Sequence, residues 1–120
     1  MATILIIDDV KTDRDLLGKV VSTTGHHAEY AADGQEGIAK AKTLKPALIL
    51  LDVMMPTLNG FETCRKLKAD PDTSSIPVVL VTSKGGESDK FWGQKQGAND
   101  HVVKPFTTKS LSTVIGRYVR

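Results

Sequence analysis

The sequence predicts an α/β fold built on a doubly wound parallel sheet. Two observations lead to this prediction: short apolar runs recur along all 120 residues, and longer stretches of mixed polarity separate them. Most of the longer stretches carry apolar residues at the three- and four-residue spacing of an amphipathic helix. Strict alternation of strands and helices is typical of a parallel sheet covered by helices on both faces. A chain of this length provides a core for one domain only.

Five strands are expected. They are predicted at residues 4–7, 27–31, 47–51, 78–81 and 102–103. The first, third and fourth are unbroken apolar runs, which is the pattern of strands buried on both faces. The second strand has a weaker pattern, and the last is short.

Five helices are expected. The core faces of the first, second, third and last are predicted to be Leu16, Leu17, Val20 and Val21; Ile38, Ala41 and Leu44; Phe61, Cys64 and Leu67; and Leu111, Val114, Ile115 and Tyr118. Gly25 and Pro46 are placed to end the first two helices. The fourth helix, at residues 87–96, offers only Phe91 and Trp92 as large apolar residues. We expect at least one of these aromatics to pack on the sheet, and the other could anchor a partner.

With right-handed crossovers, one compact solution for such a chain is a flavodoxin-like (βα)5 sheet with strand order 2-1-3-4-5. In that order the first and third strands are neighbours where the winding reverses. Ligands of such sheets bind beyond the carboxyl ends of the strands at this point.

Polar residues follow four of the predicted strands. They are Asp8-Asp9, Asp52, Thr82-Ser83 and Lys104-Pro105. Because the carboxyl ends of parallel strands share one edge, three carboxylates, two hydroxyls and one ammonium should meet there. Each of these residues alone has a simpler explanation; Asp9 or Thr12, for example, could cap the first helix. Complementary chemistry at four strand ends favours a site.

The predicted carboxylate cluster needs a counter-charge. Two like charges 4 Å apart repel by about 1 kcal/mol in water and by roughly 4 kcal/mol at an effective dielectric constant of 20. Lys104 can offset only part of this repulsion, and Mg²⁺ is the cation that oxygen ligands with retained waters favour. A carboxylate beside Mg²⁺ and an ammonium is well placed to attack phosphorus.

Four motifs, "LIIDD", "LLDVMMPTLNG", "VLVTS" and "VVKPF", occur in this order along the chain. Together they resemble the receiver domain of two-component response regulators, in the CheY-like stand-alone form, over essentially the whole chain. The resemblance implies that Asp52 accepts a phosphoryl group from the phosphohistidine of a CheA-like histidine kinase. It implies that Asp9 and Asp52 bind Mg²⁺ directly, Asp8 through water, and Met54 through its backbone carbonyl.

The resemblance also implies a switch. Lys104 would pair with Asp52 and then with the phosphoryl group, Thr82 would turn its hydroxyl toward the phosphate, and the bond before Pro105 would be cis. His101 would relay the change to a partner-binding surface formed by the fourth helix, fifth strand and fifth helix. This family usually has tyrosine or phenylalanine at the position of His101, so His101 is either a switch, made pH-dependent by its pKa near 6.5, or an ordinary strand residue.

Two residues are expected to tune the lifetime of the phosphate. Met54 and Lys84 stand two positions after the phosphoacceptor and two after the switch threonine, where side chains in this family line the route of the hydrolytic water. Met54 has no group to orient that water, so slow self-dephosphorylation is one hypothesis. The alternative is that Met54 is simply an apolar residue of the rim.

"DKFWGQKQGANDHVVKPF", with "TSSIPVV", resembles the stand-alone regulators of type IV pilus twitching motility and related chemotaxis-like systems. The chain ends at Arg120, directly after the last predicted helix, so we expect one receiver domain over residues 1–120 without an output domain. Output would then come from binding another protein, as a monomer or as a dimer formed on phosphorylation. The domain could signal or serve as a phosphate sink.

Composition narrows the other possibilities. Sixteen basic and fourteen acidic residues leave a net charge of +2, which argues against nucleic acid or an anionic membrane as the main partner. The single cysteine, Cys64, excludes an internal disulfide and suits a reduced, cytoplasmic protein. The N-terminus lacks a basic leader, and no apolar run approaches the ~20 residues of a membrane span.

Three other classes of protein share part of this pattern. A pseudo-receiver would keep the fold and signal without phosphate, but the site here is complete. A haloacid dehalogenase-type phosphatase needs a second aspartate two residues after the first, where this chain has Met54. A flavin or dinucleotide binder needs a glycine-rich first turn, which residues 9–13 do not provide.

Overall fold

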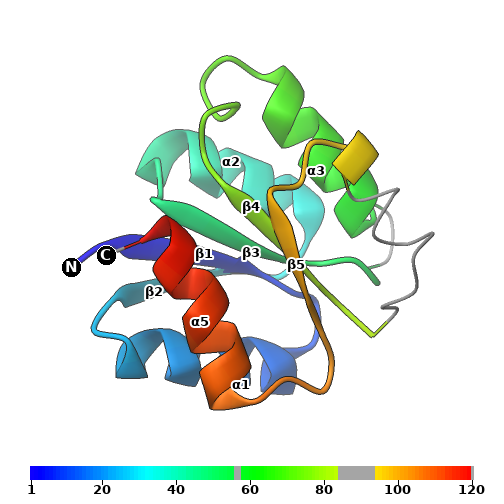
Figure 1. Ribbon diagram of the computed structural model, residues 1–120. Coiled ribbons are helices and arrows are strands. Elements are labelled where there is room, and N and C mark those ends of the chain that lie inside the picture. Colours follow the sequence, from blue (N-terminus) through cyan, green and yellow to red (C-terminus); the bar gives the residue numbers. More distant parts are fainter. Residues whose placement is uncertain (56–57, 84–93, 120) are drawn as a thin grey trace.

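The computed structural model describes residues 1–55, 58–83 and 94–119. Five parallel strands form one sheet in the order β2-β1-β3-β4-β5, which confirms the predicted topology. Helices α1 and α5 cover one face of the sheet, and α2 and α3 cover the other (Figure 1). No helix in the described part of the chain is long and apolar enough to cross a membrane.

The strands lie close to their predicted positions. Their bounds are Thr3–Ile7 for β1, His27–Ala31 for β2, Leu48–Asp52 for β3, Val78–Thr82 for β4 and Asp100–Val103 for β5. The third strand was expected to end at Leu51, but pairing with β4 continues through Asp52. The fifth strand begins two residues earlier than expected, because Asp100 and His101 pair with β4 as well.

The described helices also match their predicted positions. They are α1, Lys11–Thr23; α2, Gly34–Leu44; α3, Gly60–Ala69; and α5, Thr108–Tyr118. Asp33 caps α2 and Asn59 caps α3, each by accepting a hydrogen bond from a backbone N–H three residues on. The expected fourth helix, including Phe91 and Trp92, lies largely outside the described residues.

Alternate side chains of the buried strands serve two separate cores. Ile4 and Ile6 of β1 pack under α1 and α5, whereas Leu5 and Ile7 pack under α2 and α3. The same division holds along β3. This arrangement explains why these runs are apolar at every position, since both faces of the sheet are covered.

Two predictions about helix faces are wrong. Leu16 was expected in the core, but 51% of its surface is exposed. The buried stripe of α1 is rotated away from Leu16 because it includes Gly18, on which the ring of Tyr30 lies so closely that a Cβ at Gly18 would overlap it. Leu44 was also expected in the core and is 39% exposed, because it is the last residue of α2, where the chain turns away through a left-handed Lys45.

Candidate functional site

Three carboxylates meet where β1 and β3 end. Asp8 follows β1 directly and is fully buried, and Asp52 is the last residue of β3 and is 4% exposed. The two strands are neighbours, and their register places Ile7 opposite Leu51. Each strand is therefore followed or ended by an aspartate at the same edge of the sheet. One carboxylate oxygen from each of Asp8, Asp9 and Asp52 lies within 4.8 Å of the others.

These aspartates do not cap the helix that follows. The N-cap residue of α1 is Val10, and no side chain caps the helix there. Neither Asp9 nor Thr12 is therefore a helix cap. Asp8 instead accepts a hydrogen bond from the backbone N–H of Val10, at 2.9 Å. The Oδ1 atom of Asp9 is buried and has no hydrogen-bond partner within the described structure. A buried carboxylate oxygen without a donor is a position where a cation fits.

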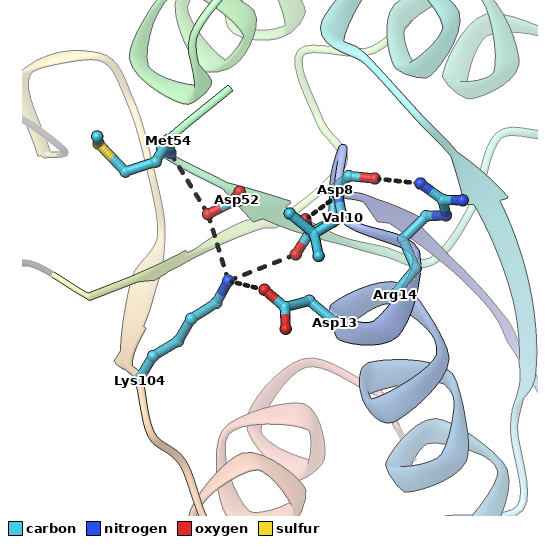
Figure 2. Close-up of polar contacts among 7 residues, drawn as sticks. All are labelled: Asp8, Val10, Asp13, Arg14, Asp52, Met54 and Lys104. Atoms are coloured by element: carbon cyan, nitrogen blue, oxygen red, sulfur yellow. Dashed lines mark hydrogen bonds and ion pairs between the residues drawn. The ribbon is translucent and has the colours of Figure 1, made fainter. Parts of the chain in front are cut away.

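Lys104 enters the cluster from the end of β5 (Figure 2). Its Nζ atom lies 3.6 Å from Asp52 Oδ1 and 3.5 Å from Asp8 Oδ2. Its shortest carboxylate contact is with Asp13 Oδ2, at 3.0 Å. The peptide bond between Lys104 and Pro105 is cis.

Sequence reasoning did not identify Asp13 as part of this site. An aspartate in the first turn of a helix is common, because it interacts favourably with the positive end of the helix dipole. Nothing in the spacing links Asp13 to Lys104, which follows it by 91 positions. Arg14 was missed as well: its Nη1 donates to the backbone carbonyl oxygen of Asp8 at 2.8 Å and braces the loop that carries the acidic pair.

Burial makes the carboxylates of the cluster costly to ionise. Burial raises the pKa of Asp52 to about 6, and the charge of Asp8 adds to the rise, while Lys104 and the backbone N–H of Met54 oppose it. Burial also raises the pKa of Asp8 above its ordinary value. For Lys104, burial acts to lower the pKa, but the hydrogen bond to Asp13 and the charges of the neighbouring carboxylates outweigh it and leave the pKa raised.

The turn after β3 is packed directly on Asp52. The N–H of Gly60 donates to the carbonyl of Val53 at 2.9 Å, which brings the start of α3 back against the strand end. A Cβ at Gly60 would overlap the carbonyl oxygen of Asp52 and would lie 2.6 Å from the Cα of Val53. Glycine is required here by space, since any side chain would push on the backbone that carries Asp52.

Met54 lies at the rim of the site. Its backbone N–H points to Asp52 Oδ1 at 3.4 Å, and the residue is 54% exposed. Figure 2 shows its side chain extending away from Asp52 and Lys104. An exposed apolar side chain at this place is compatible with both expectations, a residue of the rim and a side chain that does not orient the hydrolytic water.

The two expected switch residues lie on adjacent strands. Thr82 is the last residue of β4 and is buried, and His101 is the second residue of β5 and is half-buried. His101 is opposite Leu80 in the register, on the side of β4 away from Asp52, and lines a groove of about 430 Å³ between β5 and α5. Lys84 lies outside the described residues.

A buried aspartate at the reversal point of a 2-1-3-4-5 sheet, with two more aspartates and a lysine around it, agrees with the class that the sequence predicted, a receiver domain of signalling proteins. The chain belongs to the response regulator receiver domain family, whose model matches residues 4–116. It is similar to Protein PilH of Pseudomonas aeruginosa, with 44% identity over 115 residues that cover 96% of this chain and 95% of PilH.

Two further proteins are similar to this chain. Response regulator PleD of Caulobacter vibrioides is 43% identical over 104 residues, which cover 87% of this chain but 23% of PleD. The structure of the chemotaxis protein CheY4 of Vibrio cholerae superposes with a TM-score of 0.93 and 30% identity, over 99% of both chains. The fold and the family are therefore shown by sequence and by structure.

Proposed function

We propose that this protein is a single-domain response regulator in which Asp52 accepts a phosphoryl group from the phosphohistidine of a histidine kinase. The observation that carries this proposal is the position of Asp52: a buried carboxylate at the end of β3, with a lysine and two further carboxylates around it. A lone pair of its carboxylate oxygen forms the O–P bond while the P–N bond of the donor breaks, and the electron pair of that bond leaves with the imidazole.

The residues present fit a magnesium ion. The cluster is short of positive charge, and Oδ1 of Asp9 is buried with no donor in the described part of the chain. Asp8, Asp9 and Asp52, with the backbone carbonyl of Met54, would hold the ion. When bound, Mg²⁺ neutralises the negative charge that develops on the transferring phosphoryl oxygens. Lys104 would stabilise the same charge from the other side of the cleft.

Phosphorylation would be read out at the surface formed by the fourth helix, β5 and α5. The added charge of about −1.5 to −2 at Asp52 draws Lys104 and the Thr82 hydroxyl toward it. Thr82 and His101 lie on adjacent strands, so a movement of the threonine can alter the packing around the histidine. A downstream protein would bind this surface, with its groove between β5 and α5. Met54 and Lys84 would tune the lifetime of the phosphate.

The identity with PilH and the structural likeness to CheY4 support a pathway of the type IV pilus or chemotaxis kind. A CheA-like kinase is the phosphodonor that such a pathway would supply. The protein would act as one receiver domain over residues 1–120. Its single cysteine suits the reducing cytoplasm, where we place it.

Intact-mass measurement tests the proposed function. The protein is incubated with acetyl phosphate and Mg²⁺, and a phosphoryl adduct is expected on the wild type and none on Asp52→Asn. EDTA should suppress the adduct on the wild type. An unmodified wild-type protein in saturating Mg²⁺ would contradict the proposal and would indicate a phosphate-independent pseudo-receiver.

A further inference from the structure

The ammonium of Lys104 is shared between α1 and the phosphoacceptor. Its Nζ atom lies 3.0 Å from Asp13 Oδ2, 3.5 Å from Asp8 Oδ2 and 3.6 Å from Asp52 Oδ1. Its shortest hydrogen bond therefore goes to the helix, and its contact with Asp52 is a longer ion pair. Figure 2 shows the lysine side chain rising from the end of β5 into the space between Asp13 and Asp52. The contact with Asp52 is thus incomplete before any phosphoryl group arrives.

Asp13 differs from the other carboxylates of the cleft. It lies in the first turn of α1, and its side chain is 41% exposed, whereas Asp8 and Asp52 are buried. It lies outside the group of three oxygens that fits a cation. Its position at the helix N-terminus stabilises its negative charge, so it is a persistent acceptor for the lysine.

We propose that Asp13 is a positioning residue that competes with the phosphoryl group for Lys104 and thereby slows phosphoryl transfer to Asp52. This inference rests on the proposed function. The hydrogen bond between Asp13 and Lys104 stabilises the unphosphorylated protein, and it must weaken as the ammonium moves toward the phosphoryl oxygens. An interaction that is stronger in the ground state than in the transition state raises the barrier.

The neighbouring helix turn offers a matched control. Asp15 is on the same helix and has the same charge, but its Oδ2 pairs with Lys11 Nζ at 2.7 Å, and both side chains are largely exposed to solvent. Neutralising Asp15 therefore removes one negative charge from α1 without releasing Lys104. A difference between the two aspartates would report the specific contact and not the net charge of the helix.

The test measures the rate of phosphorylation of Asp52 by acetyl phosphate at saturating Mg²⁺, so that changes in cation affinity do not enter. In this reaction the Asp52 oxygen forms its bond to phosphorus as the donor P–O bond breaks and acetate leaves with the electron pair. Asp13→Asn is expected to react about two to five times faster than the wild type, the range for a half-exposed ion pair. Asp15→Asn should react at the wild-type rate.

A double-mutant cycle with Lys104→Met separates competition for the lysine from other effects. Lys104→Met alone should slow the reaction. The double variant Asp13→Asn/Lys104→Met should react no faster than Lys104→Met. An unchanged or slower Asp13→Asn protein, or equal acceleration with and without Lys104, would overturn the inference while leaving the proposed function intact. A wild-type protein that forms no adduct would overturn both.

Discussion

Asp52 is costly to keep charged in the metal-free protein. Its carboxylate is 4% exposed and lies beside Asp8, and its pKa rises from 3.8 to about 6. Lys104 compensates only in part, because Asp13 and Asp8 also hold its ammonium. At the scale of single residues, the ionised site is thus less stable than an uncharged one would be. A bound cation would offset this cost.

The raised pKa of Asp52 sets the sign of a pH dependence. Between about pH 4 and pH 6 the folded protein binds a proton at Asp52 that the unfolded chain releases. The free energy of unfolding in EDTA should therefore fall as the pH rises through this window. At neutral pH, Asp52→Asn should raise the free energy of unfolding by about 1 to 3 kcal/mol.

Urea denaturation in EDTA at several pH values measures this effect. Asp70→Asn is the control, because Asp70 pairs with Lys42 and its pKa is lowered, chiefly by that hydrogen bond, so its removal should not stabilise the protein. An Asp52→Asn protein no more stable than the wild type at pH 7 would show that the buried charge is already compensated.

At the scale of elements, the start of α3 determines where the end of β3 lies. The N-cap Asn59 begins the helix, and the next residue, Gly60, fits against the backbone of Asp52 and Val53 without room for a side chain. Asp52 is thus held from both sides, by the sheet and by the helix that follows.

Gly60→Ala should disturb both stability and chemistry. The new Cβ would have to displace backbone atoms of the strand end, and such overpacking typically costs about 1 to 3 kcal/mol. We expect a lower free energy of unfolding and a slower reaction of Asp52 with acetyl phosphate.

A second glycine in a helix serves as the control for this substitution. Gly116 is exposed in α5, and a Cβ there would meet nothing within 4 Å. Gly116→Ala should stabilise the protein by up to about 1 kcal/mol through helix propensity alone. If Gly60→Ala proved as stable and as reactive as Gly116→Ala, the close fit at the end of β3 would not matter.

At the scale of the whole molecule, the sheet divides the interior into two cores that are each covered by helices. Cys64 belongs to the core under α2 and α3 and is fully buried. Burial raises the pKa of its thiol to about 11, although the charge of Lys68 opposes the shift. Both solvent access and ionisation of this thiol therefore depend on the intact fold.

Alkylation of Cys64 should report unfolding of the molecule. At pH 8 its thiolate would be far scarcer than that of an ordinary cysteine, so iodoacetamide should react very slowly with the native protein. Reaction in strong urea should be fast, and native reaction should speed up in destabilised variants such as Gly60→Ala. Rapid alkylation of the native wild type would show that this core opens locally.

Much of this architecture was predictable because the signals are local. The unbroken apolar runs around Ile6 and Leu50 indicate strands covered on both faces, and the polar residues that follow them indicate one sheet edge. The fold class and the convergence of Asp8, Asp9, Asp52 and Lys104 follow from these patterns, and the observed strand order is one of the compact solutions that right-handed crossovers allow.

The tertiary structure alone decided three further features. Leu16 is exposed because Gly18 and the Tyr30 ring rotate the buried face of α1, and Gly60 is needed because α3 packs on the end of β3. Asp13 holds Lys104 because α1 and the end of β5 face each other across the cleft. The sequence determined which residues reach the edge of the sheet, since strand periodicity and polarity are local. It could not determine how the lysine is divided among its acceptors, since that depends on distances of a few tenths of an ångström between elements far apart in the chain.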